Sequence, residues 1–165
     1  MDNMGIDPTQ VWASTDTPPW GVGDVVFNKT SAGEKGYVFV KDSGSGITGD
    51  GYVCIMDGSD YTAAMVTDTL SAPGAGQGKL CGVARAAIAA SGYGWLQIYG
   101  PGTIRTLTLC AAYTQLTTSA TAGALDDATT AGLEVVDGMV LDTATGGATA
   151  NTAGFLNWPK IGRTL

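Results

Sequence analysis

The chain has 165 residues, of which 44% are hydrophobic and 14% are charged. A single domain of this length can bury a real core, because about 70% of its unfolded surface is hidden on folding. Fifteen acidic residues against eight basic ones give a formal net charge of −7, which argues against binding to nucleic acid or to an anionic membrane. The 25 glycines, together with abundant threonine and alanine, predict a mainly β domain with little helix.

Residues 1–20 are predicted to form an extended N-terminal arm. Three prolines interrupt any helix or central strand there, and Trp12 and Trp20 stand among polar residues. We expect the arm to pack on the body or on a neighbouring subunit, with these tryptophans as anchors. The start of the chain lacks the pattern of a signal peptide, and no stretch has the roughly 18 apolar residues that span a bilayer, so we expect synthesis in a cytoplasm.

The predicted β domain covers residues 21–145. Segments 24–28 and 37–41 have strand character, and the turn formers at 29–36 predict a hairpin with a long loop between them. Further strands are expected at 52–56, 63–67 and 79–85; residues 57–60 separate the first two, and a glycine-rich loop at 71–78 precedes the third.

A hairpin is most strongly indicated in the middle of this domain. Residues 93–99 alternate between two faces, Gly-Pro-Gly at 100–102 is a strong turn sequence, and 103–113 is the expected return strand. A second hairpin is predicted at 133–142, where Asp-Gly at 137–138 suits a two-residue turn because glycine accepts the left-handed backbone.

The predicted strand at 93–99 places three aromatic side chains, Tyr93, Trp95 and Tyr99, on one face. We interpret this face as a packed face of the sheet or as an intersubunit contact, since aromatic residues are enriched in both. Stacking against sugar rings is the alternative interpretation.

Residues 146–165 are predicted to form a C-terminal docking segment. Trp158 lies there among other apolar residues close to the end of the chain. Such a cluster indicates a terminal segment that packs onto an apolar surface.

Reactive side chains are scarce. The chain has no histidine, which removes Ser-His-Asp and Cys-His nucleophilic sites and most zinc sites. Cys54, Cys81 and Cys110 are odd in number and far apart, so we expect three reduced thiols in the core. We therefore predict that the protein is not an enzyme and that it holds no cofactor and no metal.

The acidic and glycine-rich segments are interpreted as turns. Neighbouring residues on a strand point to opposite faces, so Asp126 and Asp127 make a poor acid–base pair, and we expect them to cap backbone amides. The loops at 42–50 and 57–60 lack the spacing of a calcium-binding EF-hand. The segment at 74–80, GAGQGKL, lacks the hydroxyl residue of a phosphate-binding loop.

Five short motifs stand out along the chain: GDVV at 23–26, GVA at 82–84, IAA at 88–90, GYGWLQ at 92–97 and TAGALDDA at 121–128. Together they resemble the pattern of the small head-decoration, or cement, proteins of tailed bacteriophages. The resemblance covers residues 23–27 and 81–128, under half of the chain. The N-terminal arm and the Gly/Thr-rich region after residue 143 depart from that pattern.

The resemblance implies a small β-sandwich or β-barrel that adds to the outer surface of an assembled capsid in the virion. Such proteins lie over junctions between coat subunits, often as trimers, and brace the shell against the pressure of the packaged DNA. The implied partners are the major capsid protein and further copies of this chain, as a homotrimer. Trp12, Trp20 and Trp158 are the candidate contact residues.

Two other functions are weighed against this one. A carbohydrate- or receptor-binding module of a fibre or spike would use the aromatic face and the Asp/Gly loops, but the chain shows no repetitive stalk sequence. A hydrolase with a purely acidic site would need two well-placed carboxylates, and the adjacent Asp126 and Asp127 do not provide them.

Overall fold

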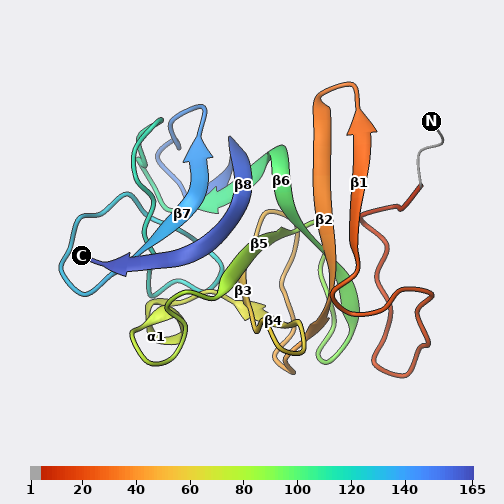
Figure 1. Cartoon of the computed structure of the whole chain (residues 1–165). Coiled ribbons are helices and arrows are strands. Elements are labelled where there is room, and N and C mark those ends of the chain that lie inside the picture. The colour runs from red at the N-terminus through yellow and green to blue at the C-terminus, as the bar shows by residue number, and fades with distance from the viewer. Residues whose placement is uncertain (1–4) are drawn as a thin grey trace.

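The computed structural model describes residues 5–165, which form a mainly β domain (Figure 1), so the predicted fold class is confirmed. The strands are β1 (Val25–Thr30), β2 (Gly33–Asp42), β3 (Val53–Met56), β4 (Thr62–Met65), β5 (Leu80–Ala84), β6 (Tyr93–Thr106), β7 (Glu134–Leu141) and β8 (Ala150–Thr164). One short helix, α1 (Asp68–Ser71), begins after Thr67, whose hydroxyl accepts the N–H of Leu70. Within the described residues, no helix is long and apolar enough to cross a membrane.

All eight strands belong to one mixed sheet, in the order β1-β2-β4-β3-β5-β6-β8-β7. Because β2 also pairs with β6, the five strands β2, β4, β3, β5 and β6 close into a ring and make a small barrel. The later part of β6 leaves this ring and pairs with β8, and β8 pairs in turn with β7 (Figure 1). The sheet therefore combines a closed barrel with an extension whose last strand is β7.

Three apolar clusters hold the fold together. The first fills the barrel with side chains that alternate along its strands; its buried members are Val38, Val40, Ile47, Cys54, Met56, Ala63, Ala84, Ile88, Leu96 and Ile98. The second lies outside the barrel, between the outer face of β3 and β5 and the extension of the sheet. Its members include Ile104, Leu116, Leu125, Val136, Leu141, Leu156 and Ile161. Since β3 and β5 contribute to both clusters, every residue of β3 is buried.

The third cluster joins the described part of the N-terminal arm to the barrel. Trp12 exchanges two backbone hydrogen bonds with Tyr93 of β6, of 3.0 and 2.9 Å. The Trp12 ring meets Phe39 edge-on, with 5.2 Å between centroids, and Trp20 meets Trp95 in the same way at 5.4 Å. From Gly5 onward, the arm thus covers one outer face of β2 and β6.

The predicted hairpin around residues 100–102 is wrong, because β6 runs unbroken through Gly-Pro-Gly. Gly100 has a φ of +91°, and a Cβ there would collide with the carbonyl oxygen of Glu34 on β2. The buried amide of Gln97 donates to the carbonyl oxygens of Tyr99, Gly100 and Pro101, at 3.1, 3.3 and 3.0 Å. These glycines therefore bend a long strand from β2 toward β8 instead of reversing it.

The predicted turn at 137–138 is also wrong. β7 continues through it, but its register against β8 shifts, so that Met139 lies opposite Leu156 while Asp137 lies opposite Lys160. Gly138, with a φ of +79°, sits in this irregularity. Asp-Gly supplies the left-handed backbone that a turn needs, and here a bulge uses the same property.

Two further segments are more regular than predicted. The hairpin of β1 and β2 is confirmed, but its strands extend to Thr30 and Gly33, which leaves only residues 31–32 as the turn in place of the long loop at 29–36. The predicted docking segment at 146–165 contains β8, the longest strand, which lies between β6 and β7 as an integral part of the sheet.

Candidate functional site

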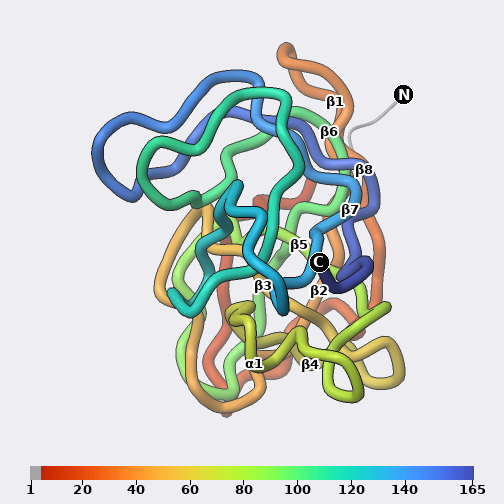
Figure 2. The backbone as a smooth tube through the Cα atoms, turned by 90° about the vertical axis from the view of Figure 1, so that its left-hand side faces the viewer, coloured from red at the N-terminus to blue at the C-terminus, as the bar shows by residue number. Residues whose placement is uncertain are grey.

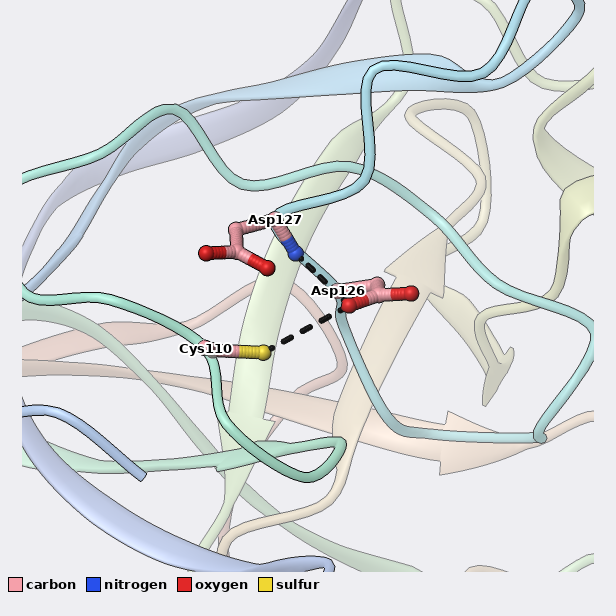
Figure 3. A group of neighbouring side chains, drawn as sticks. All are labelled: Cys110, Asp126 and Asp127. Atoms are coloured by element: carbon pink, nitrogen blue, oxygen red, sulfur yellow. Dashed lines mark hydrogen bonds between the residues drawn. The ribbon is translucent and has the colours of Figure 1, made fainter. Parts of the chain in front are cut away.

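The described residues contain one cluster of potential metal ligands, formed by Cys110, Asp126 and Asp127 (Figure 3). The Cys110 thiol donates to Oδ1 of Asp126 at 3.6 Å, and the same oxygen accepts the N–H of Asp127 at 2.9 Å. Oδ2 of Asp127 accepts the N–H of Ala111 at 2.8 Å. Burial raises the pKa of the Cys110 thiol to about 11, so the sulfur stays protonated at neutral pH. The cluster locks two chain segments together, and its aspartates cap backbone amides as predicted.

The acidic loops have the same structural role. Asp57 accepts hydrogen bonds from the N–H and hydroxyl of Ser59, at 3.0 and 2.6 Å, and Asp60 accepts the same pair from Thr62. Oδ2 of the buried Asp42 accepts three backbone N–H groups, of Gly44, Gly46 and Ser91. These carboxylates shape their own turns, and Oδ1 of Asp42 is buried without a hydrogen-bond partner among the described residues.

The predicted aromatic face is divided by the structure. Tyr93 and Trp95 lie with Phe39 under the N-terminal arm, so Trp95 is fully buried. Between Tyr37–Gln97 and Gly36–Tyr99 the β2–β6 register shifts, and this bulge turns Tyr99 to the other face of the sheet. The expectation that all three aromatic residues share one face is therefore wrong for Tyr99.

Tyr99 instead joins an exposed row of rings, which we call the aromatic patch: Phe27 of β1, Tyr99 of β6, and Phe155 and Trp158 of β8. Ring centroids lie 6.2 Å apart for Trp158 and Phe27, 6.1 Å for Phe27 and Tyr99, and 5.7 Å for Tyr99 and Phe155. Phe27, Phe155 and Trp158 are 42%, 36% and 47% exposed. A contiguous aromatic surface of this kind is unusual on a monomer unless it is a binding site.

The backbone of β8 presents Trp158 outward. Its φ is +48°, a left-handed conformation that is rare for a bulky residue. Leu156 of β8 pairs with Met139 of β7, and Lys160 pairs with Asp137. The chain advances by four residues on β8 but by only two on β7 between these pairs. Trp158 therefore lies in a bulge of β8. The bulge aims the indole at Phe27 across the sheet instead of continuing the alternation of the strand.

An apolar pit opens beside the patch, at the side of the barrel. Its lining consists of Val25, Val38, Met56, Tyr61, Leu80, Cys81, Ile98, Trp158 and Pro159. Val25 and Leu80 on its wall are themselves exposed. Patch and pit together form a continuous apolar surface with few polar groups to orient a small ligand, a composition that suits an apolar protein side chain.

The three tryptophans predicted as contact residues have different places in the structure. Trp12 and Trp20 are half-buried in the cluster under the arm, whereas Trp158 is exposed in the patch. The structure brings Phe27, Tyr99 and Phe155 to Trp158, and none of these three was among the predicted contacts. The available signal for Phe27 was the apolar run at 25–27, in which the alternation of a strand places Phe27 on the face opposite to Val26.

The comparisons with known proteins add no family to this picture. No protein-family model matches the chain, and a search of curated proteins finds no match either. The candidate site therefore rests on the geometry of the patch and pit.

Proposed function

We propose that this protein is a structural virion protein that decorates the outer surface of an assembled phage capsid and stabilises it by bridging neighbouring subunits. The observation that carries the proposal is the exposed aromatic patch with its adjoining pit. The partners we propose are the major capsid protein and further copies of this chain.

The energetics of the patch support a protein partner. A fully buried aromatic side chain removes about 150–250 Å² from water, and interface hot spots are enriched in such residues. The patch offers three exposed rings and one half-buried ring, on strands β1, β6 and β8 of one sheet. Rings held by a sheet lose little conformational freedom on docking. On a symmetric shell, identical weak contacts also add through effective concentration.

The rest of the molecule supports a mechanical role. A barrel that buries apolar residues on both faces of β3 and β5 resists deformation. The cysteine thiols are buried, and Asp42, Asp57 and Asp60 accept hydrogen bonds from their own turns. A brace needs this rigidity and needs no reactive group.

The experiment is cosedimentation with capsids that lack this protein. We expect the wild-type chain to bind with a copy number comparable to that of the coat protein, and the double variant Phe27→Ser/Trp158→Ser to bind at least about tenfold more weakly. Leu70→Ser is the matched control, since Leu70 is an exposed apolar residue on α1, outside the patch.

The same experiment has an outcome that contradicts the proposal. Wild-type chain that stays in the supernatant at all concentrations rules out a decoration role. A glycan-binding screen then tests the alternative of a carbohydrate- or receptor-binding module, for which the exposed rings of the patch would be the stacking surface.

A further inference from the structure

The three most exposed large apolar side chains of the described residues share one backbone property. They are Tyr113, Leu109 and Trp158, with exposures of 75%, 74% and 47%. Their φ angles are +58°, +64° and +48°, so all three adopt the left-handed conformation that favours glycine. Strained backbone that persists in a fold is a pointer to function, because a sequence without a use for these side chains can relieve the strain with glycine.

Leu109 and Tyr113 form a protrusion that we call the knob. Their segment is held in place by backbone hydrogen bonds: Leu109 N–H donates to Gly146 O and Tyr113 N–H donates to Leu141 O, both at 3.0 Å. Between them, Cys110 is buried and bonded to Asp126. The backbone hydrogen bonds and the buried Cys110 therefore hold the knob in one position, with Leu109 and Tyr113 exposed on the surface.

The knob and the aromatic patch lie at different places on the molecule. The knob is tied to Leu141 at the end of β7 and to the connection before β8, whereas Trp158 lies four residues beyond Gly154, the partner of Leu141 on β8, about 13 Å along an extended strand. In Figure 2 the connection before β8 lies at the left, and β8 runs from there across the view to the right-hand side, where its label stands. Both surfaces are exposed in the single chain, so neither of them covers the other.

The two surfaces differ in the charges beside them. The acidic residues next to the knob are Asp126, which is bonded to Cys110, Asp127, and Asp142, which follows Leu141. Asp127 lies beside the knob, where it binds the N–H of Ala111. Residues 106–149, which contain the knob and precede β8, include no lysine or arginine.

Two of the basic residues flank the patch. Lys29 follows Phe27 by two positions on β1, and Lys160 follows Trp158 by two on β8; both are exposed. Glu34 and Asp137 lie opposite them on neighbouring strands, yet neither lysine forms an ion pair among the described residues. The two ammonium groups therefore remain free for carboxylates of another molecule.

We propose that copies of this chain associate head to tail, with the knob of one copy seated in the pit and against the aromatic patch of the next. The acidic surroundings of the knob would then face Lys29 and Lys160, which offsets the repulsion between molecules of net charge −7. Because the contact joins two different surfaces, it generates a closed ring when the rotation between copies closes. This inference rests on the proposed function and makes the patch the contact between copies, so that the patch variant loses capsid binding because it no longer forms the multivalent ring.

The experiment measures the mass of the wild-type chain by sedimentation velocity across concentrations, against a monomer of 16.7 kDa. We expect oligomers that dissociate as salt is raised. The knob variant Leu109→Ser/Tyr113→Ser and the patch variant Phe27→Ser/Trp158→Ser should each be monomeric, and Leu70→Ser should assemble like wild type.

Mixing the knob and patch variants restores one intact contact, so heterodimers should form but no larger ring. Thermal melts confirm that each variant is folded, and Tyr113→Ser alone is the milder second variant.

Two results overturn the inference. One is a wild-type chain that stays monomeric at every concentration. The other is assembly that the patch variant abolishes and both knob variants leave intact, which would mean that the patch pairs with itself. Failure of the proposed function looks different: wild-type rings form but do not cosediment with capsids. A monomeric wild-type chain that does bind capsids removes the head-to-tail contact and leaves the decoration role standing.

Discussion

The ring of Phe27 lies directly over Gly36 of the neighbouring strand. A Cβ at Gly36 would come within 2.8 Å of Cε1 of Phe27 and within 3.1 Å of Cβ of Tyr99. The glycine therefore leaves a gap on β2 that lets a side chain of β1 reach across to β6. This gap joins the two halves of the aromatic patch.

Gly36→Ala should disrupt the patch with little effect on the fold. The added methyl displaces the Phe27 ring, and because Phe27 is exposed, the free energy of unfolding should fall by only about 1 kcal/mol. Binding to capsids and self-association should both weaken, as measured by cosedimentation and sedimentation velocity. Gly58→Ala is the control, since nothing lies within 4 Å of a Cβ at that position. Unchanged binding by Gly36→Ala would show that the ring of Phe27 does not need its present position.

Substitutions at Trp158 should separate strain from docking. With a φ of +48°, the position favours glycine, so Trp158→Gly should be about 1 kcal/mol more stable than Trp158→Ala in urea unfolding. Both variants lose the indole, so both should lose docking to the same extent. If alanine proves as stable as glycine, the backbone at this position is not strained.

The class of the fold could be predicted from composition, but the path of the long strands could not. Gly-Pro-Gly at 100–102 and Asp-Gly at 137–138 carry the local chemistry of turns, and both lie within strands. At the first, three hydrogen bonds from the Gln97 side chain hold the bend. Turn propensities consider only the residues of the turn itself and so do not take Gln97 into account. At the second, pairing with β8 on both sides of Asp-Gly outweighs the local preference.

The candidate site was predictable only in part, for a related reason. Trp158 could be singled out, because a tryptophan in an apolar cluster near a chain end is conspicuous. Its partners could not, since Tyr99 reaches the patch only through the register shift between β2 and β6. Phe27 reaches it only because Gly36 lies beside it. Such relationships depend on strand register, which alternation within one strand does not determine.

Gln97→Leu should destabilise the protein strongly. The Gln97 amide is fully buried and donates to three carbonyl oxygens at the bend of β6. Leucine removes all three hydrogen bonds but also removes the buried Oε1 of Gln97, which has no partner among the described residues, so the free energy of unfolding should fall by about 1–3 kcal/mol in urea titrations. Gln77→Leu, at an exposed position, is the control and should change stability by less than about 0.5 kcal/mol. Equal effects of the two substitutions would mean that the bend holds without these bonds.

The buried thiols should make the protein less stable in alkali. Burial raises the pKa of Cys54 and Cys81 well above the ordinary value of 9.0. The two thiols are protonated in both states below pH 9, so their contribution is fully present there. Above pH 9 only the unfolded chain loses these protons, and stability should fall by about 1.4 kcal/mol per pH unit for each thiol.

Urea titrations between pH 8 and 10.5 measure this slope, and Cys54→Ala isolates one thiol as the difference in slope from wild type. The buried Tyr37, whose pKa is also raised by burial, contributes equally to both proteins and cancels. A thiol reagent at pH 8 should react with Cys54, Cys81 and Cys110 only after unfolding, because all three side chains are buried in the native fold. Rapid reaction of the native protein, or identical slopes for the variant and wild type, would contradict the buried placement of these side chains.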